Sequence, residues 1–260
     1  MAASRAARGY SGRVDVKLYA MAISHPSQAA RKMLDLKGVD YELVSVAPLN
    51  QRVHVRLAGF RGGTVPALRA DGRRIQGSRQ IARAADQLWP DPPLFPADPT
   101  LRARVEEAEL WGERYLQPVP RRLARFGAGH DLNLRRSAAK SQSLPLPEVL
   151  ARVSVPVVRY YARASELDGR RADEAGVRAD LATLPALLDH ADSLLAEGTL
   201  ATDPPNAATL QILSSVRVLA EFADLRDHLD GRPSTAAAHL VFPSYPTSVP
   251  SFLPREWVRP

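Results

Sequence analysis

The sequence predicts an α/β domain followed by an all-α domain. Three observations support this division of the 260-residue chain, which is long enough for two hydrophobic cores. Short apolar runs typical of strands alternate with a helical segment in the first third of the chain. The proline-rich stretch Pro90-Asp91-Pro92-Pro93 then interrupts this pattern. Beyond it, apolar residues recur every three or four positions, as they do on the buried face of a helix.

The first half of the α/β domain is predicted to be strand, helix, strand. Residues Val14–Tyr19 alternate apolar and polar side chains in the manner of a half-buried strand. A helix is predicted from about Pro26 to Leu36, and Gly38 should follow its C-terminal end. Residues Tyr41–Val46 predict a second strand. Short connections between these elements imply a right-handed, parallel βαβ unit.

The second half of this domain is predicted to be a β-hairpin followed by a helix. Residues Val65–Arg69 and Arg73–Ile75 flank the dipeptide Asp71-Gly72, which favours a tight hairpin turn. Ser78 is expected to cap a helix that runs to about Leu88. The order βαβ and then ββα is the thioredoxin-like arrangement.

The remainder of the chain predicts a bundle of helices. Asp98 and Pro99 are the residue types of an N-cap and a first helical position, and Pro118 should end or kink this helix. A later helix should stop near Gly198, and Asn206 should cap the next one. The predicted divisions are a flexible tail (1–13), a thioredoxin-like domain (14–89), a linker (90–97), an all-helical domain (98–235) and a Pro-rich extension (236–260).

Composition excludes several classes of function. The chain has no cysteine, which rules out disulfides and a cysteine nucleophile, so any thiol chemistry must use a thiol that the ligand brings. The six histidines show no metal-binding spacing, and no metal is expected. No apolar run approaches the roughly 20 residues that cross a bilayer, and the N-terminus lacks the features of a secretory signal. We therefore expect a cytoplasmic protein without a membrane partner.

The positive charge of the chain is concentrated in one segment. Between Leu49 and Arg83 there are eight arginines and a single acidic residue, Asp71, so this window carries the whole net charge of +7. A local positive field attracts small anions as well as phosphate backbones. Aromatic residues do not alternate with these arginines as a surface for single-stranded nucleic acid requires. The sequence therefore favours a small anionic ligand over a nucleic acid, with a solvated arginine-rich surface as the other interpretation.

Two segments of the α/β domain together predict a site for a small, peptide-like anion. In Thr64–Leu68 a strand begins at Pro66, and the main chain beside this proline can pair with an extended ligand. In Gly77–Ile81 a helix begins at Ser78. Its hydroxyl and the free N–H groups of the first helical turn can bind a carboxylate.

The residues of the first domain resemble the cytosolic glutathione transferases. The likeness covers Val16 to about Pro99 closely, and it extends to Pro233 by the pattern of helices. Three pieces of it are specific, and it is their combination that indicates the fold strongly. The similar segments are residues 18–19, 24–27 and 30–38 (first strand and active-site helix), 64–68 (cis-proline strand) and 77–81 (the helix start with an acidic residue and a serine).

This resemblance implies a thiol co-substrate and assigns residues to it. Ser24 lies where the family places the hydroxyl that hydrogen-bonds the sulfur, with Ser27 as the alternative; Ser24 could equally be no more than a helix cap. Val65 would pair its main chain with the ligand, and Pro66 would be cis. The predicted catalytic residue is thus Ser24, and the predicted cofactor-binding residues are Ser27, Val65, Pro66, Gly77, Ser78 and Arg79.

One position departs from the family pattern. Gly77 stands where the family commonly has Glu or Asp, the side chain that would receive the γ-glutamyl ammonium of glutathione. Gln76 could take this role, or it could face outward from the end of its strand. The thiol is therefore expected to be glutathione or another low-molecular-weight thiol. The neighbouring arginines 52, 61, 74 and 79 suit a more anionic one.

By resemblance, the protein is expected to be a glutathione-transferase-like enzyme that activates a small thiol for attack on an apolar electrophile. A homodimer is expected on the same basis. Trp111 and Tyr115 could wall the electrophile site or belong to the core, and Tyr19 and Tyr10 are weaker candidates for the catalytic hydroxyl. His25 is expected to be an exposed loop residue. The alternative function is a non-catalytic member of the same fold that binds a ligand or another protein.

Overall fold

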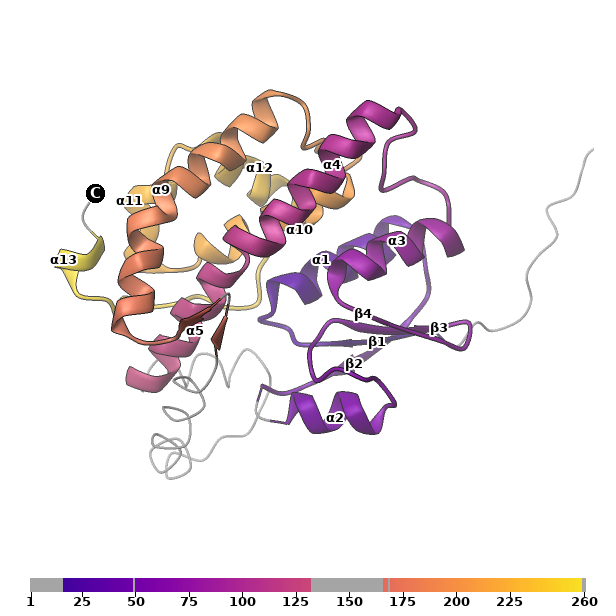
Figure 1. Ribbon diagram of the computed structural model, residues 1–260, viewed down its shortest axis with the longest axis horizontal. Helices are drawn as coiled ribbons and strands as arrows, with labels where there is room; N and C mark the ends of the chain where they lie inside the picture. Colours follow the sequence, from indigo (N-terminus) through magenta and orange to yellow (C-terminus); the bar gives the residue numbers. More distant parts are fainter. Residues whose placement is uncertain (1–15, 49, 132–165, 168, 259–260) are drawn as a thin grey trace, which may run out of the picture.

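The computed structural model describes residues 16–48, 50–131, 166–167 and 169–258. In Figure 1 the chain forms a small sheet with its helices, coloured indigo to purple, and a larger group of helices beside it. The two parts meet where α1 (His25–Leu36) packs against α10 (Ala207–Leu219). The predicted fold class, a thioredoxin-like domain followed by a helical domain, is confirmed.

The N-terminal domain is built on a four-stranded sheet with the order β2-β1-β3-β4. β1 and β2 are parallel, whereas β3 is antiparallel to both of its neighbours, β1 and β4. This is the βαβ-ββα arrangement that the sequence predicts. The strands are β1 (Lys17–Ala20), β2 (Glu42–Ser45), β3 (Ala67–Ala70) and β4 (Arg73–Gln76).

The turn between β3 and β4 has the backbone of a two-residue hairpin. Asp71 and Gly72 both have positive φ angles, of 50° and 71°. Such turns need positive φ at both central residues, and Asp-Gly is one of the pairs that tolerate it. The turn fixes the register of the hairpin, in which Ala67 lies opposite Gln76.

Helices cover both faces of the sheet. α1 and α3 (Ser78–Leu88) lie between the sheet and the helical domain, and α2 (Gln51–Leu57) lies on the opposite side (Figure 1). Leu18 belongs to the core under α1 and α3, whereas Tyr19 belongs to the core that includes α2, as alternate residues of a strand should. The sequence pattern does not predict α2, because its only buried side chain is Val55 and it has no apolar stripe.

Local residues set the ends of α1 and α3. Pro26 lies in the first turn of α1, where a missing N–H costs no helical hydrogen bond. Gly38, with φ of 63°, follows the helix end in the left-handed conformation, as predicted. The expectation that Ser78 caps α3 is wrong. Gly77 is the N-cap, with φ of 93°, and Ser78 occupies the first helical position.

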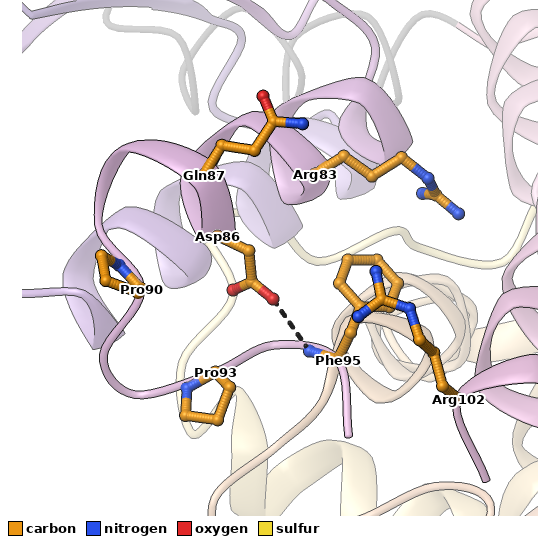
Figure 2. A pocket seen from close by; sticks show the side chains of 7 residues that line it. All are labelled: Arg83, Asp86, Gln87, Pro90, Pro93, Phe95 and Arg102. Carbon is orange, nitrogen blue, oxygen red and sulfur yellow. Dashed lines mark hydrogen bonds between the residues drawn. The ribbon is translucent and has the colours of Figure 1, made fainter. Parts of the chain in front are cut away.

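The segment between the two domains is fixed by the carboxylate of Asp86. This group accepts hydrogen bonds from the main-chain N–H groups of Leu94 (2.8 Å) and Phe95 (3.1 Å). Figure 2 shows the second of these bonds, with the guanidinium groups of Arg83 and Arg102 near the Phe95 ring. They lie 4.9 and 5.0 Å from its centroid, within the range of cation–π attraction. The segment is therefore a fixed spacer between α3 and the helices that follow.

The second domain surrounds α10, in which all 13 residues are buried. Asn206 caps this helix as predicted: its Oδ1 accepts from Thr209 N–H (2.9 Å), and its Nδ2 donates to the Thr199 carbonyl (2.8 Å). A short hairpin of β5 (Glu166–Leu167) and β6 (Arg170–Arg171) precedes α9. The other helices are α4 (Pro99–Trp111), the π-helical turn η1 (Gly112–Leu116), α5 (Pro118–His130), α9 (Glu174–Ala196), η2 (Ala223–Leu225), α11 (Arg226–Leu229), α12 (Pro233–Val241) and α13 (Arg255–Val258).

The C-terminal part of the chain packs on the second domain. The expected boundary at residue 235 falls inside α12, which packs against α10. The following segment contains α13 and lies along the helical domain, with Phe242, Val249 and Leu253 buried. Its apolar side chains therefore extend the core of the second domain. The predicted N-terminal tail, residues 1–13, lies outside the described residues.

Candidate active site

One edge of the sheet gathers the segments that the sequence analysis singles out. Tyr19, near the end of β1, lies opposite Ala67, the first residue of β3. β1 therefore ends at the edge where β3 begins, and the chain continues from there to Ser24. Val65–Pro66 precedes β3 at the same edge. β4 is antiparallel to β3, so it ends there as well, before Gly77–Ser78. The chain topology therefore brings all three predicted segments together.

A hydrogen bond joins the proline segment to the start of α3. The Gly77 N–H donates to the Pro66 carbonyl at 2.9 Å. The Val65–Pro66 peptide bond is cis, as the resemblance implies. The Val65 side chain packs in the core, while its main-chain N–H and C=O form no hydrogen bond with another described residue. These two groups are available to pair with an extended ligand.

Ser78 combines a buried position with a hydroxyl that no described residue binds. The residue is 4% exposed and begins α3 without a side-chain capping bond. The N–H groups of a first helical turn have no partners within the helix, and partial positive charge gathers there. The hydroxyl and these N–H groups together suit a carboxylate.

Ser24 has a fixed main chain and a hydroxyl without a partner among the described residues. Its N–H donates to the Met21 carbonyl (3.0 Å), and its C=O accepts from the Gln28 N–H (2.9 Å). By its backbone Ser24 is the N-cap of α1, yet its hydroxyl makes no capping hydrogen bond. The interpretation of Ser24 as only a helix cap therefore loses its basis, and the hydroxyl is available to a ligand.

Ser27 holds a structural place in the same loop. Its side chain is fully buried, and its Oγ accepts a hydrogen bond from the Met21 N–H (3.3 Å). Next to it, Gln28 Nε2 donates to the Ala22 carbonyl (2.5 Å). The Ser27 hydroxyl is therefore engaged within the loop itself, and its role in binding the cofactor stays a prediction.

The amide of Gln76 supports the loop that precedes the proline. Its Oε1 accepts from the Gly62 N–H (2.9 Å), and its Nε2 donates to the Thr64 carbonyl (2.7 Å). A Cβ added to Gly62 would lie 2.5 Å from Gln76 Oε1, so a side chain at this position would displace the Gln76 amide. Gln76 is therefore occupied within the protein, and Gly77 has no side chain that could bind an ammonium group.

Arg79 forms ion pairs across the domain interface. Its Nη1 lies 3.0 Å from Glu113 Oε2, and its Nε lies 3.8 Å from Glu109 Oε2. Arg83 Nη1 lies 2.8 Å from the same Glu109 oxygen. Burial raises the pKa of Glu109 to about 7, which the two arginines oppose only in part. Arg79, predicted to bind the cofactor, thus joins α3 to α4 and η1.

His25 is buried beside Ser24, against the second domain. It is 3% exposed, and its Nε2 has no hydrogen-bond partner in the described part of the chain. Burial lowers its pKa well below the ordinary 6.5, the Arg121 cation lowers it further, and a hydrogen bond with the Gln117 main chain raises it in part. The expectation of an exposed loop histidine is wrong. The imidazole is neutral near pH 7 and forms a hydrogen bond with the main chain of Gln117, directly before α5.

We expect His25 to make the protein less stable in acid. Below about pH 6.5 the unfolded chain protonates this residue while the folded chain does not, so the free energy of unfolding falls as the pH decreases. The dependence is about 1 kcal/mol per pH unit. In urea denaturation at about pH 7.5 and 5.5, His25→Asn should lose less stability than the wild type. A loss equal to that of the wild type would contradict a buried neutral imidazole. The exposed His239→Asn should behave like the wild type.

Arg121 adds positive charge on the same side of the site. It lies on α5, four residues after Gln117, and its charge acts on His25. Burial and the neighbouring Arg125 lower its pKa to about 10, whereas Glu113 opposes this change. The guanidinium still carries its proton near pH 7. The helical domain therefore places a cation near His25, the residue that follows Ser24.

The aromatic candidates lie in other surroundings. Tyr19 is buried in the core cluster that includes α2. Trp111 packs on the ring of His190, with 4.4 Å between centroids. Tyr115 is 49% exposed on η1. Tyr10 lies outside the described residues, and of these candidates none is placed by the structure beside Ser24.

The hollow in Figure 2 is separate from this site. It has a volume of about 510 Å³ and lies between the C-terminal half of α3 and the interdomain segment, against Asp86 and Phe95. Asp86 follows Ser78 by eight residues, which is about 12 Å along a helix. Because Asp86 already binds the Leu94 and Phe95 N–H groups, we assign this hollow to the fixed spacer between the domains.

The arrangement at the sheet edge can accommodate three parts of one ligand. The Val65 main chain can pair with a peptide unit, the start of α3 at Ser78 can hold a carboxylate, and the Ser24 hydroxyl can donate to a third group. Among the described residues, no cluster of His, Cys, Asp or Glu is placed to hold a metal ion. No described helix has the length and apolar character needed to span a bilayer.

Comparison with known families matches the first domain. Residues 18–93 match the glutathione S-transferase N-terminal domain, a range that contains every site residue predicted from the sequence. No curated protein matches the chain.

Comparison with solved structures shows a shared two-domain fold over most of the chain. A beta-etherase from Sphingobium sp. strain SYK-6 has a TM-score of 0.58 at 18% identity, covering 86% of this chain and 98% of its own. A glutathione S-transferase from Rhodospirillum rubrum F11 has a TM-score of 0.53 at 20% identity, with coverages of 94% and 98%. A maleylacetoacetate isomerase from Anaeromyxobacter dehalogenans 2CP-1, solved with dicarboxyethyl glutathione and citrate in its active site, has a TM-score of 0.51 at 20% identity, with coverages of 88% and 86%.

Proposed function

We propose that this protein binds a glutathione-type thiol and activates it for attack on an electrophile. The protein has the two-domain fold of the glutathione S-transferases, and its residues 18–93 match their N-terminal domain. The observation that supports this proposal most is that the Val65 main chain, Ser78 and Ser24 lie at the same edge of the sheet. The similar structures include a transferase, an etherase and an isomerase, which supports a glutathione-transferase-like enzyme in the broad sense. Transfer of the thiol to carbon is our proposal.

The chemistry rests on ionisation of the thiol. A free thiol has a pKa of about 8.5, so only a few per cent is nucleophilic thiolate at neutral pH. A hydrogen bond from the Ser24 hydroxyl and the partial positive charge at the start of α1 both favour the anion. The thiol proton passes to solvent. The sulfur lone pair then forms a C–S bond with the electrophile, whose leaving group departs with the displaced electron pair.

The carboxylate of the thiol ligand would lie at the start of α3. There the Ser78 hydroxyl and the unpaired N–H groups of the first turn offer hydrogen bonds to an anion. The γ-glutamyl ammonium, in contrast, meets no side chain at Gly77 and an occupied amide at Gln76. We therefore propose a thiol that is recognised by its peptide backbone and carboxylate, with little contribution from an amino group.

We expect Ser78→Ala to weaken binding of glutathione about tenfold, measured by isothermal titration calorimetry. A hydrogen bond to a charged group contributes about 1.5–3 kcal/mol, and a tenfold change in Kd corresponds to about 1.4 kcal/mol. Acetylation of the glutathione amino group should change the Kd by less than about twofold, because a lost charged hydrogen bond would change it tenfold or more.

The matched control is Ser193→Ala, which removes an exposed hydroxyl on α9 that is bonded to the Asp189 carbonyl. This variant should bind glutathione as the wild type does. A wild-type Kd in Ser78→Ala would remove the carboxylate assignment. A tenfold loss on acetylation would show that another group receives the ammonium. Absence of any thiol binding would overturn the proposed function.

The electrophile and the assembly are proposed from the resemblance. An apolar electrophile fits the expected class of reaction, although Gln117 and Arg121, the residues of the second domain that act on His25, are polar. A homodimer is proposed on the same basis, and sedimentation velocity tests it. The alternative function, a non-catalytic binding module, is favoured by Gly77, which lacks the family's acidic side chain. Thiol binding without conjugation of an aromatic electrophile would establish it.

A further inference from the structure

The loop before Ser24 receives a hydrogen bond from the far end of the chain. The Tyr245 hydroxyl donates to the Ile23 carbonyl at 3.0 Å, across 222 positions of sequence. Tyr245 belongs to the C-terminal segment that follows α12. The segment that the sequence analysis treats as a Pro-rich extension thus contacts the residue next to the candidate catalytic serine.

Tyr245 is anchored on both sides. Before it, the Phe242 carbonyl accepts a hydrogen bond from Arg217 Nε (2.9 Å), and the same guanidinium lies 5.7 Å from the Tyr245 ring centroid. After it, the Val249 N–H donates to the Glu221 carbonyl (2.8 Å). Arg217 and Glu221 lie on α10 and directly after it, at the centre of the second domain. The tyrosine is therefore held by a helix whose 13 residues are all buried.

The phenol is a permanent donor in this position. The ring packs against the main hydrophobic core, and burial raises the pKa of Tyr245. Its proton therefore stays on the oxygen over the range in which the protein is folded. Its partner, a main-chain carbonyl, can only accept. Tyr245 is therefore the donor and Ile23 the acceptor of this hydrogen bond at any working pH, and the bond fixes the carbonyl of Ile23.

The Ile23 carbonyl and the Ser24 N–H belong to one planar peptide unit. Tyr245 holds one side of this unit, and the Met21 carbonyl holds the other through the Ser24 N–H (3.0 Å). The Ser24 carbonyl is held in turn by the Gln28 N–H. With these three bonds in place, the direction of the Ser24 side chain depends on a single rotation about its Cα–Cβ bond.

We propose that Tyr245 is a positioning residue for Ser24, and that the segment from Phe242 to Val249 straps the active-site loop to the helical domain. The inference rests on the proposed function in so far as Ser24 activates a thiol. A hydroxyl stabilises a thiolate only over a narrow range of distance and angle. Displacement of a catalytic group by about 1 Å can cost up to 100-fold in rate. The strap thereby couples the fold of the second domain to chemistry at the first.

Amide hydrogen exchange tests the strap without any assay of activity. In Tyr245→Phe the ring and its packing remain and only the hydroxyl is lost, so exchange of the Ser24 and Gln28 N–H groups should become about tenfold faster. The matched control is Tyr41→Phe, which removes the hydroxyl bonded to Asp35 Oδ1 (3.0 Å) in the same domain. It should leave these amides unchanged. Equal exchange in Tyr245→Phe and the wild type would overturn the proposal.

Kinetics then test the link to Ser24. With glutathione and an aromatic electrophile, Tyr245→Phe should lower kcat about three- to tenfold, leave the KM for the thiol within about twofold, and raise the pKa of the bound thiol seen in the pH–rate profile. A merely structural tyrosine would lower the melting temperature and leave that kinetic pKa unchanged, which would contradict a positioning role.

The two proposals fail in different ways. Faster exchange in Tyr245→Phe with no thiol conjugation by the wild type would keep the strap and remove the proposed function. Normal thiol conjugation by the wild type, with unchanged amide exchange in Tyr245→Phe, would keep the proposed function and remove the strap. If Tyr245→Phe does not fold, Val249→Ala loosens the anchor without touching the loop. Faster exchange at Ser24 in that variant supports the strap, and unchanged exchange rejects it.

Discussion

Replacement of Ser24 by alanine is expected to lower kcat/KM for thiol conjugation by roughly 10- to 100-fold at neutral pH. The hydroxyl is unbound by described residues, partly exposed, and set on a main chain that hydrogen bonds hold on both sides. A hydrogen bond to an ionised group is worth about 1.5–3 kcal/mol, and loss of this energy from the thiolate form raises the pKa of the bound thiol by about one to two. Less thiolate is then present at pH 7.

Ultraviolet titration of the thiolate in the bound complex measures this change directly. Ser27→Ala is the informative comparison, because Ser27 is fully buried and bonds only the Met21 N–H. It should cost stability and leave the pKa of the bound thiol closer to the wild-type value. If Ser27→Ala raised that pKa more than Ser24→Ala does, the catalytic assignment would pass to Ser27.

Replacement of Asp180 by asparagine is expected to lower the free energy of unfolding by about 3–5 kcal/mol. Asp180 and Arg122 form a doubly hydrogen-bonded ion pair between α9 and α5. The side chain of Arg122 is 0% exposed and that of Asp180 is 3% exposed. Removal of the Asp180 charge takes a carboxylate away from the buried Arg122 guanidinium, whose desolvation cost is then compensated less, and this loss exceeds the value of the pair itself. Urea denaturation monitored by circular dichroism measures the loss.

Two further variants separate burial from simple charge pairing. The double variant Arg122→Met with Asp180→Leu should recover most of the lost stability, because apolar replacement of a whole buried pair is often neutral. On α9, Glu174→Gln breaks an exposed pair with Arg178 (3.4 Å) and should change stability by less than about 0.5 kcal/mol. If Asp180→Asn lowered the free energy of unfolding by less than about 1 kcal/mol, this would contradict the assignment of a buried ion pair.

Much of the fold is predictable because its signals are local. The Asp71-Gly72 turn needs positive φ at both residues, Gly38 ends α1, and Asn206 caps α10 through a residue three positions away. Each of these features depends on a few adjacent residues, which the sequence displays. The segments at the sheet edge follow from strand order alone, once the hairpin and the parallel unit are recognised.

Other features depend on contacts that local patterns do not contain. Ser78 has the residue type of an N-cap, but the positive φ of Gly77 gives that role to the glycine. Pro233 resembles a stop signal, yet it begins α12, since proline suits a first helical turn as well as a helix end. His25 is buried only because the second domain covers it.

The arginine-rich window between Leu49 and Arg83 shows that the local charge also depends on contacts that the sequence pattern does not contain. Counted along the sequence, the window carries the whole net charge of the protein. In the structure Arg79 and Arg83 are paired with Glu109 and Glu113, which come from α4 and η1. A count along the sequence cannot include acidic partners from another domain, so it overstates the field that a ligand meets.

The most direct test is a crystal structure of the protein with glutathione at saturating concentration. We expect the cysteinyl unit to pair with the Val65 main chain and a carboxylate to lie at the Ser78 hydroxyl and the start of α3. The sulfur should lie within hydrogen-bonding distance of Ser24 Oγ. Glutathione bound elsewhere, or with its sulfur directed away from Ser24, would contradict this expectation.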